Sequence, residues 1–271
     1  MAVFLLPAIL FMAATFLLPL LVVAYTSISG EAGLTLEHYR ELFSRPLYAI
    51  VLKNTLEISV LSTALTLLLG YPIAYHLSRQ SPARRAFLII LVLLPFWTSI
   101  LVKSFAFTVL LGHNGLVNSV LVSALGSGAR IKLLFNRPGV IIGMTHFLLP
   151  FMVFTILASL VTQNPDLRRA AEIMGAGRVR IFWNVTLPLS MPGVLAGVLF
   201  CMILSLGMFV TPALLGGRTD LMISNLVDFH VRETLNWNVA AAVSMCLILL
   251  TAVFTIMLAR IRGGQLFEAA R

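Results

Sequence analysis

The sequence predicts an all-α, multi-pass membrane protein with six transmembrane helices, and three observations support this fold class. Hydrophobic residues make up 59% of the 271 residues and charged residues only 11%, a balance that excludes an ordinary soluble domain. Six apolar runs are each about 20 residues or longer, enough to cross a hydrocarbon core of about 30 Å. The charged residues gather mostly between these runs. Because six spans and their connections use up the chain, we expect one transmembrane domain over residues 1–271.

The predicted spans cover residues 3–28, 55–77, 86–111, 139–161, 192–214 and 238–261. The first run has no basic leader and is too long for the apolar part of a cleavable signal, so we expect it to be retained as a span. Prolines inside or at the ends of several spans predict kinked helices. An even number of spans places both termini on the same side of the membrane.

The distribution of arginines predicts which side that is. The connection between the second and third spans carries Arg79, Arg84 and Arg85 without an acidic residue, and segment 162–191 carries four more arginines. Three further arginines lie near the end of the chain, whereas the remaining loops mix basic and acidic residues. The positive-inside rule therefore predicts that this face, with both termini, is cytoplasmic.

The net charge of +9 is interpreted as membrane topology and contact with lipid headgroups. No stretch combines basic residues with base-stacking aromatics, so we expect no nucleic-acid partner. Cys201 and Cys246 lie inside apolar runs and the five histidines are dispersed, which argues against a metal site. No nucleophile lies beside a general base. We therefore expect no catalytic residue, metal or cofactor in this chain.

Segment 162–191 is the most organised connection in the sequence. Asn164 followed by Pro165 is a strong helix start, because asparagine caps free amides and proline suits the first turn. Asp166 complements the positive end of the helix dipole. One apolar face then recurs at helical spacing, formed by Leu167, Ala170, Ala171 and Met174. These features predict a short amphipathic helix outside the bilayer.

Glycines predict how that helix ends. Gly175 can adopt the left-handed conformation that closes a helix, and Gly177 allows a second sharp turn. A second short segment over residues 178–187 should end at Pro188, before the fifth span opens at residue 192. Two interpretations remain for the resulting helix-turn-helix element. It either lies on anionic lipid through its arginines or docks on another protein.

The same segment carries a spaced pattern in which Ala170 and Ala171 are followed by Gly175, Val185, Leu187 and Pro188. It resembles the cytoplasmic signature of ABC importer permeases, EAA, three residues, Gly, nine residues, Ile, one residue, Leu-Pro. Arg169 stands where the family usually has glutamate. The likeness to permeases of the spermidine/putrescine type covers nearly the whole chain, including LEHYRELF at residues 36–43, LLPFWTSILVKSFAFTVLLGHNGLVN at 93–118 and VTPALLGG at 210–217.

This resemblance implies the permease fold of a type I ABC importer in a bacterial inner membrane. The implied partners are a dimer of cytoplasmic ATPase subunits, a second permease that is a different chain, and an extracytoplasmic solute-binding protein. Because this chain has no phosphate-binding GxxxxGK[ST] loop, ATP and Mg²⁺ would bind to the ATPase partner. The residues that would contact the ATPase are Leu167, Arg169, Ala170, Ala171, Glu172, Met174, Gly175, Ala176, Val185, Leu187 and Pro188.

Four residues are candidates to line a solute pathway, namely Glu57, Trp97, Lys103 and Phe209. A carboxylate inside a span needs a partner or a watery cavity, although Glu57 can instead pair with Lys53 one turn away near the headgroups. Lys103 can either snorkel or line the passage. Aromatic faces attract cations, but aromatic residues in spans more often pack. Relatives often carry an acidic residue where this chain has Met208, which weakens the polyamine assignment.

Two other classes of function are weighed against an importer subunit. A secondary transporter driven by an ion gradient favours paired intramembrane charges and repeated halves. An intramembrane enzyme needs convergent Ser, His, Asp or metal-ligating residues. The sequence presents neither pattern. We therefore predict a transporter subunit that imports a small solute, a polyamine or a related organic compound.

Overall fold

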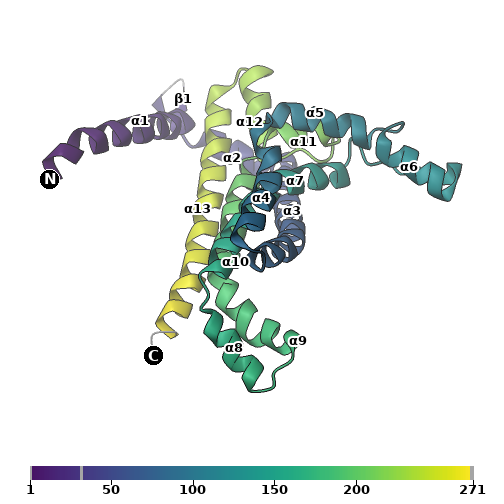
Figure 1. The fold of residues 1–271 in the computed structure, drawn as a ribbon. Helices are drawn as coiled ribbons and strands as arrows, with labels where there is room; N and C mark the ends of the chain where they lie inside the picture. Colours follow the sequence, from purple (N-terminus) through teal and green to yellow (C-terminus); the bar gives the residue numbers. More distant parts are fainter. Residues whose placement is uncertain (1, 31–32, 269–271) are drawn as a thin grey trace.

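The structure is a computed structural model that describes residues 2–30 and 33–268. Four long helices form the bundle: α3 (Pro46–Ser78), α7 (Arg137–Val161), α10 (Leu187–Leu206) and α13 (Trp237–Glu268). A fifth long helix, α1 (Ala2–Ile28), precedes a two-residue hairpin of β1 (Ser29–Gly30) and β2 (Gly33–Leu34). Figure 1 shows α7 and α10 at the centre, α13 along one side, and the C-terminus toward the end that carries α8 and α9.

Shorter helices connect these elements. They are α2 (Glu37–Ser44), α4 (Pro82–Leu93), the 3-10 turn η1 (Leu94–Trp97), α5 (Ile100–Leu111), α6 (Leu116–Leu125), the 3-10 turn η2 (Ser127–Ala129), α8 (Pro165–Ile173), α9 (Arg178–Ile181), the π-helical turn η3 (Phe182–Thr186), α11 (Val210–Leu215) and α12 (Ile223–Arg232).

Six helical stretches of the described chain are long and apolar enough to cross a membrane. They are Leu10–Ile28, Pro46–Ser78, Ile100–Leu125, Arg137–Val161, Arg178–Leu206 and Trp237–Met257. The predicted all-α, six-span architecture is therefore confirmed, although the individual bounds differ. The second span, for example, begins about three turns before the predicted residue 55 because Pro46 opens α3 at its first position.

The core lies where α7 packs against α3 and α10. Leu148, Met152 and Ile156 of α7 are fully buried there. The facing helices contribute small residues, as membrane helices do where their backbones approach closely. A Cβ added at Gly193 or Gly197 of α10 would collide with side chains of α7. On α3, small side chains turn inward at helical spacing, whereas leucines such as Leu68, 68% exposed, face outward.

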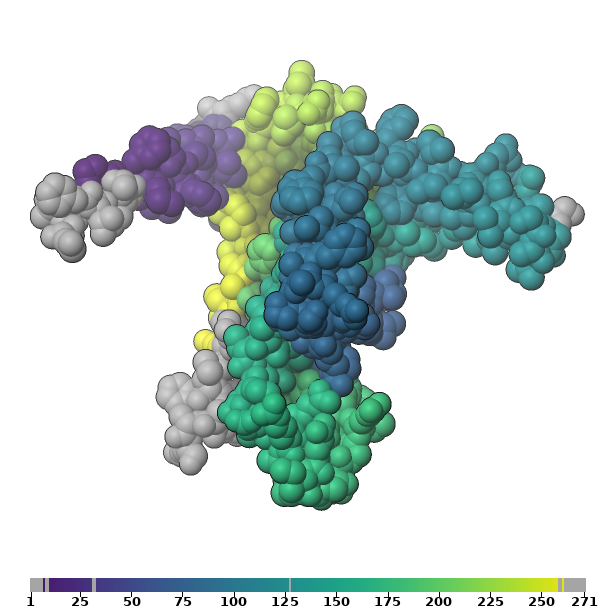
Figure 2. Space-filling model, viewed as in Figure 1, coloured from purple at the N-terminus to yellow at the C-terminus, as the bar shows by residue number. Residues whose placement is uncertain are grey.

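Two arms project from this bundle. Figure 1 shows α1 leaving on one side and α5 with α6 leaving on the other, and Figure 2 shows both as arms that extend outward from the bundle. Most described side chains of α1 are exposed, and it contacts α13. Its C-terminal end is held by hydrogen bonds from Tyr39 Oη to Ser27 Oγ (2.8 Å) and from Asn238 Nδ2 to the Ser29 carbonyl (2.8 Å).

The prediction of one continuous third span over residues 86–111 is wrong. The chain forms α4, then the 3-10 turn η1, then an extended Thr98 with φ −90° and ψ 143°, before α5 begins. Pro95 lacks an amide and cannot continue the α-helical hydrogen bonding, so the turn tightens. The Pro95 carbonyl instead accepts from Lys103 Nζ at 2.9 Å. The sequence predicts a kink at Pro95 within one span, whereas the structure breaks the helix completely there.

The fifth span also differs from its prediction, because Pro188 does not end the preceding segment. The chain is helical without a break from Arg178 through η3 to Leu206, where α10 ends, short of the predicted residue 214. In the π turn the Leu187 amide bonds to the Phe182 carbonyl, five residues back. The helix therefore changes from the i to i−4 to the i to i−5 hydrogen-bonding pattern just before Pro188. Proline has no amide hydrogen, so it leaves no donor unpaired at this position. Residues 207–209 are not helical, and they separate α10 from α11.

Candidate functional site

A helix-turn-helix element formed by α8 and α9 extends from one end of the bundle (Figure 1). The predicted start of α8 is confirmed, because Asn164 Oδ1 accepts a hydrogen bond from the Asp166 amide at 2.9 Å and Pro165 occupies the first turn. Asn164 therefore satisfies an amide that the helix leaves free. The element begins four residues after the last residue of α7, so α8 is closely tied to the bundle.

Gly175 ends α8 as the sequence predicts. Its φ is +77°, in the left-handed region that glycine enters without steric cost. The Met174 amide bonds to the Ala170 carbonyl at 3.0 Å, and the Ala176 amide reaches back to the Ala171 carbonyl at 3.0 Å. Gly177 has φ −69° and lies at the N-cap of α9 in an extended conformation. Only the first of the two glycines therefore uses the left-handed region.

The predicted apolar face of α8 divides into a buried and an exposed part. Ala171 is 6% exposed, and α8 contacts α9 and η3. By contrast, Leu167 is 49% and Met174 80% exposed. Two further apolar side chains of the element that were not predicted from the sequence, Ile173 and Val179, are also exposed. We call Leu167, Ile173, Met174 and Val179 the docking surface, because exposed apolar side chains on such an element favour a partner.

The charges of α8 are paired within the helix. Arg169 Nη1 lies 3.1 Å from Asp166 Oδ1, and Arg168 Nε lies 2.9 Å from Glu172 Oε1. All four side chains are exposed, so these pairs add little stability. Arg169, at the position where the family usually has glutamate, thus forms its ion pair with the first turn of its own helix.

The other residues proposed for ATPase contact are spread over the whole element. Ala170 is exposed and Ala176 is half-buried in the turn after α8. Val185 lies half-buried in η3, and Leu187 and Pro188 begin α10. Val185 thus belongs to the base of the element and Leu187 and Pro188 to the bundle, whereas Leu167 and Met174 lie on α8.

The four candidate pathway residues lie on four different segments of the chain. Glu57 lies in α3 and Lys103 in α5, where the Lys103 ammonium lies 5.3 Å from the Phe147 ring centroid. Trp97 is 71% exposed in η1, and Phe209 lies between α10 and α11. Among the described residues, these four side chains form no hydrogen bond or ion pair with one another. Their role in lining a solute pathway stays a prediction.

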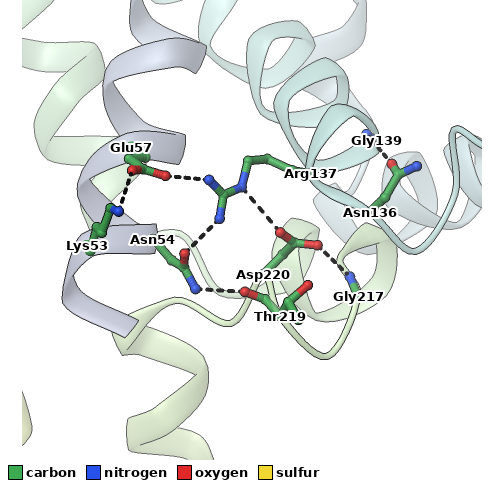
Figure 3. Close-up of polar contacts among 9 residues, drawn as sticks. All are labelled: Lys53, Asn54, Glu57, Asn136, Arg137, Gly139, Gly217, Thr219 and Asp220. Carbon is green, nitrogen blue, oxygen red and sulfur yellow. Dashed lines mark hydrogen bonds and ion pairs between the residues drawn. The ribbon is translucent and has the colours of Figure 1, made fainter. Parts of the chain in front are cut away.

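Glu57 belongs instead to a polar cluster that the sequence analysis missed (Figure 3). The expected pair with Lys53 is present at 3.6 Å. A second cation, Arg137 at the start of α7, donates from Nη1 to Glu57 Oε2, from Nη2 to Asn54 Oδ1 (2.7 Å) and from Nε to Asp220 Oδ1 (3.3 Å). The guanidinium therefore joins α3, α7 and the loop between α11 and α12.

Backbone contacts extend this cluster along the same loop. Asn54 Nδ2 donates to the Thr219 carbonyl at 2.7 Å, and the Gly217 amide donates to Asp220 Oδ2 at 3.3 Å. At the start of α12 the Ile223 amide donates to Thr55 Oγ1 at 2.9 Å. Arg137 begins α7 and Asp220 lies in a loop, so the sequence presents these two charges only as topology signals, whereas Glu57 stands inside α3. Their spatial convergence is a property of the bundle.

Comparisons with known proteins assign this architecture to a family. The profile of the family described as "Binding-protein-dependent transport system inner membrane component" matches residues 10–263. The spermidine/putrescine transport system permease protein PotB of Haemophilus influenzae is 38% identical over 220 residues, covering 81% of this chain and 77% of the relative. PotB of Escherichia coli is 34% identical over 224 residues, covering 83% and 80%.

A solved structure shares the fold over most of both chains. A chain of the bacterial alginate ABC transporter, in complex with an alginate pentasaccharide-bound periplasmic protein, superposes with a TM-score of 0.81 at 21% identity. The match covers 95% of this chain and 91% of that one. With six spans, a helix-turn-helix element at one end and a family match over nearly its full length, this chain belongs to the inner membrane components of binding-protein-dependent transport systems and is a multi-pass permease subunit of an ABC importer.

Proposed function

We propose that this permease forms half of a translocation pathway for a polyamine and that a cytoplasmic ATPase drives it through the α8–α9 element. The observation that carries the proposal is the docking surface, four exposed apolar side chains of an element whose base packs on the bundle. Exposed apolar groups on such an element favour contact with a partner protein. The sequence has no GxxxxGK[ST] loop, so ATP and Mg²⁺ are assigned to that partner.

The α8–α9 end is assigned to the cytoplasm, together with both termini. The assignment is supported by Arg79 after α3, by Arg84 and Arg85 in the first turn of α4, and by the four arginines of α8 and α9, all near the same end of the bundle. Basic residues in short connections favour the cytoplasmic side. On this orientation the Arg137 cluster lies toward the extracytoplasmic side, where the solute-binding protein delivers its solute.

A second permease subunit is the proposed partner of α1. This helix carries apolar side chains such as Phe11 (70% exposed) and Phe16 (73% exposed) around its surface and projects from the bundle. A helix that is apolar all round is normally buried in protein or in lipid. The second permease can supply part of that cover and the other half of the pathway. We expect it to be a different chain, as the resemblance implies.

The polyamine assignment rests on the relatives. Both PotB proteins carry spermidine and putrescine in their names, and this chain aligns with most of their length. A polyamine is a flexible cation, which carboxylates and aromatic faces can attract. Glu57 and Asp220 are carboxylates at the proposed outer end, but both are paired with Arg137. The chemical identity of the cargo is therefore the part of the proposal that most requires a transport measurement.

The test is co-purification with and without the element. The tagged chain is solubilised gently from its native membranes, and its partners are identified by mass spectrometry for the wild type and for a variant in which residues 168–177 are replaced by a glycine-serine linker of equal length. Recovery of an ATPase and a second permease is expected, with the ATPase alone lost from the variant. Retention of the ATPase by the variant would overturn the coupling role of α8.

The cargo is tested with the purified complex in proteoliposomes. Uptake of radiolabelled spermidine is expected only when ATP and the solute-binding protein are both supplied. Uptake of spermidine by this chain alone, without ATP, would favour the secondary transporter instead. ATP-dependent uptake of a different solute would retain the ABC importer and replace the polyamine.

A further inference from the structure

A basic pocket lies between the base of α8 and the ends of α3, α7 and α10. Its volume is about 280 Å³, and its lining includes Arg79, Arg85 and Arg168 from three different parts of the chain, with Tyr75 and Gln163 beside them. No acidic residue lines it. From this arrangement we propose that the pocket binds a phosphate-bearing anion, supplied by the headgroup of an anionic phospholipid.

The arginines are poised to bind because part of their hydrogen-bonding capacity is unused. Arg85 is fixed by donating from Nε to the Leu77 carbonyl (3.1 Å) and from Nη2 to the Ser78 carbonyl (2.9 Å), which leaves Nη1 without a partner among the described residues. Arg79 rests its guanidinium 4.3 Å from the Tyr75 ring centroid and forms no ion pair in the described chain. Preorganised guanidinium groups are the side chains best suited to phosphate.

The net positive charge of the pocket also favours a bound anion. Of the three arginines only Arg168 has a carboxylate partner, Glu172. The pocket therefore holds an excess of positive charge, and like charges that lie close together are stabilised by an anion between them. A carboxylate from the protein does not fill this role in the described residues, so the anion is expected to come from outside the chain.

The apolar part of the lining favours a lipid as the source. Leu160, Val161 and Leu189 share the pocket with the arginines. They lie at the ends of membrane-spanning helices, the depth at which headgroups meet acyl chains. A phospholipid can place its phosphate among the guanidinium groups and its chains along the bundle. Which leaflet supplies it depends on the proposed cytoplasmic orientation of α8.

Binding there has a consequence for coupling. One wall of the pocket is the start of α8, through Asn164, Pro165 and Arg168, and the opposite walls are the ends of α3, α7 and α10. An occupant thus touches both the docking element and the bundle. Because a ligand that prefers one relative position of two elements shifts their equilibrium, we expect the bound anion to strengthen the attachment of α8 to the bundle.

The experiment compares Arg79→Gln with Arg84→Gln. Both arginines are exposed where α3 connects to α4, Arg79 directly after α3 and Arg84 in the first turn of α4, but only Arg79 lines the pocket. The full chain, purified with its accompanying subunits, is exchanged into a mixture of phosphatidylglycerol and phosphatidylcholine, and retained lipid is measured by native mass spectrometry. Arg79→Gln should retain phosphatidylglycerol about tenfold more weakly, as expected for one lost charge-assisted hydrogen bond. Arg84→Gln should match the wild type.

A second arm identifies the source of the phosphate. Inorganic phosphate is titrated by calorimetry into the same three proteins in phosphatidylcholine nanodiscs. Saturable binding that Arg79→Gln abolishes, without enrichment of phosphatidylglycerol, would assign the pocket to free phosphate. Equal behaviour of the two variants in both arms, with equal thermal stability, would overturn the proposal. This experiment measures bound phospholipid and phosphate, and the co-purification test measures recovery of the ATPase, so failure of the one leaves the other unaffected.

Discussion

Arg137 at the start of α7 donates from Nε to Oδ1 of Asp220, 3.3 Å away, although 83 positions separate the two residues in the chain. The Asp220 side chain is only 7% exposed. A buried carboxylate is tolerated when it is paired and hydrogen-bonded. Arg137 therefore joins α7 to the loop after α11. It also neutralises the buried Asp220 carboxylate of that loop.

Arg137→Ala is expected to destabilise the protein by about 3 kcal/mol, because it leaves the buried Asp220 carboxylate without its cation. The measurement is thermal unfolding in a mild detergent. Arg130→Ala is the matched control, since Arg130 is exposed and forms no ion pair in the described chain. Combining Arg137→Ala with Asp220→Asn should recover part of the loss, because the unpaired charge is then removed. Equal unfolding temperatures for Arg137→Ala and wild type would contradict the pairing.

Gly175→Val should uncouple transport from ATP hydrolysis while leaving the protein inserted. An added Cβ at Gly175 would meet nothing within 4 Å, but φ is +77°, a conformation that a β-branched residue avoids. The turn must therefore change, and α9 is redirected relative to α8. Uptake and ATPase activity of the reconstituted complex are the readouts.

Two other substitutions separate backbone conformation from bulk at this turn. Gly175→Asn should keep most of the coupling, because asparagine tolerates the left-handed region better than other residues. Gly177→Ala should be nearly neutral, since Gly177 has φ −69° and open space around it. If Gly175→Val and Gly175→Asn lost coupling equally, the conformational explanation would fail.

Ile173→Asp should abolish co-purification of the ATPase without lowering stability. The Ile173 side chain is 86% exposed, so the substitution removes no internal packing and its effect on unfolding should stay within about 0.5 kcal/mol. At the centre of a docking contact, however, a carboxylate would be left desolvated and unpaired. Leu36→Asp is the control, because Leu36 is 70% exposed before α2. Loss of the ATPase from both variants would point to general damage rather than to the docking surface.

The sequence predicted the α8 segment well because its determinants are local. Asn164 caps the helix that follows it, and Gly175 ends that helix, by interactions within a few residues. The sequence predicted only a kink at Pro95 and no break at Gly207, because uniformly apolar runs carry no periodicity that distinguishes one long span from two shorter helices. The predicted helix end at Pro188 was wrong for a related reason. The π turn η3, which lets the helix continue through this proline, has no signal in the local sequence pattern.

The Arg137 cluster could not be predicted from local pattern at all. Arg137, Glu57 and Asp220 lie on three segments that are far apart in the chain, and no local pattern in the sequence links one of them to another. Only the close packing of α3 against α7, made possible by small inward-facing side chains, brings them together. Glu57 was singled out because a carboxylate in a span needs a partner, but the nearest cation in sequence, Lys53, is only one of its two partners.

Acidification is expected to weaken the attachment of α12 to α3 through His230. Its Nε2 lies 3.1 Å from Tyr48 Oη, and the two rings stack with centroids 6.1 Å apart. Burial lowers the pKa of His230 below the ordinary value of 6.5, with Arg45 adding to this effect and Glu41 opposing it. The unfolded chain therefore takes up the proton first as the pH falls.

Because the unfolded chain is protonated at a higher pH than the folded protein, acidification destabilises the fold. The contribution of His230 to stability is complete above about pH 6.5 and is lost as the pH falls through the lowered pKa of the folded state. Unfolding temperatures measured between pH 8 and pH 5 (roughly the titration range of histidine) should fall less for His230→Gln than for the wild type. His113→Gln, at an exposed histidine, should keep the wild-type slope. A His230→Gln slope equal to that of the wild type would show that the α12 contact is not the titrating element.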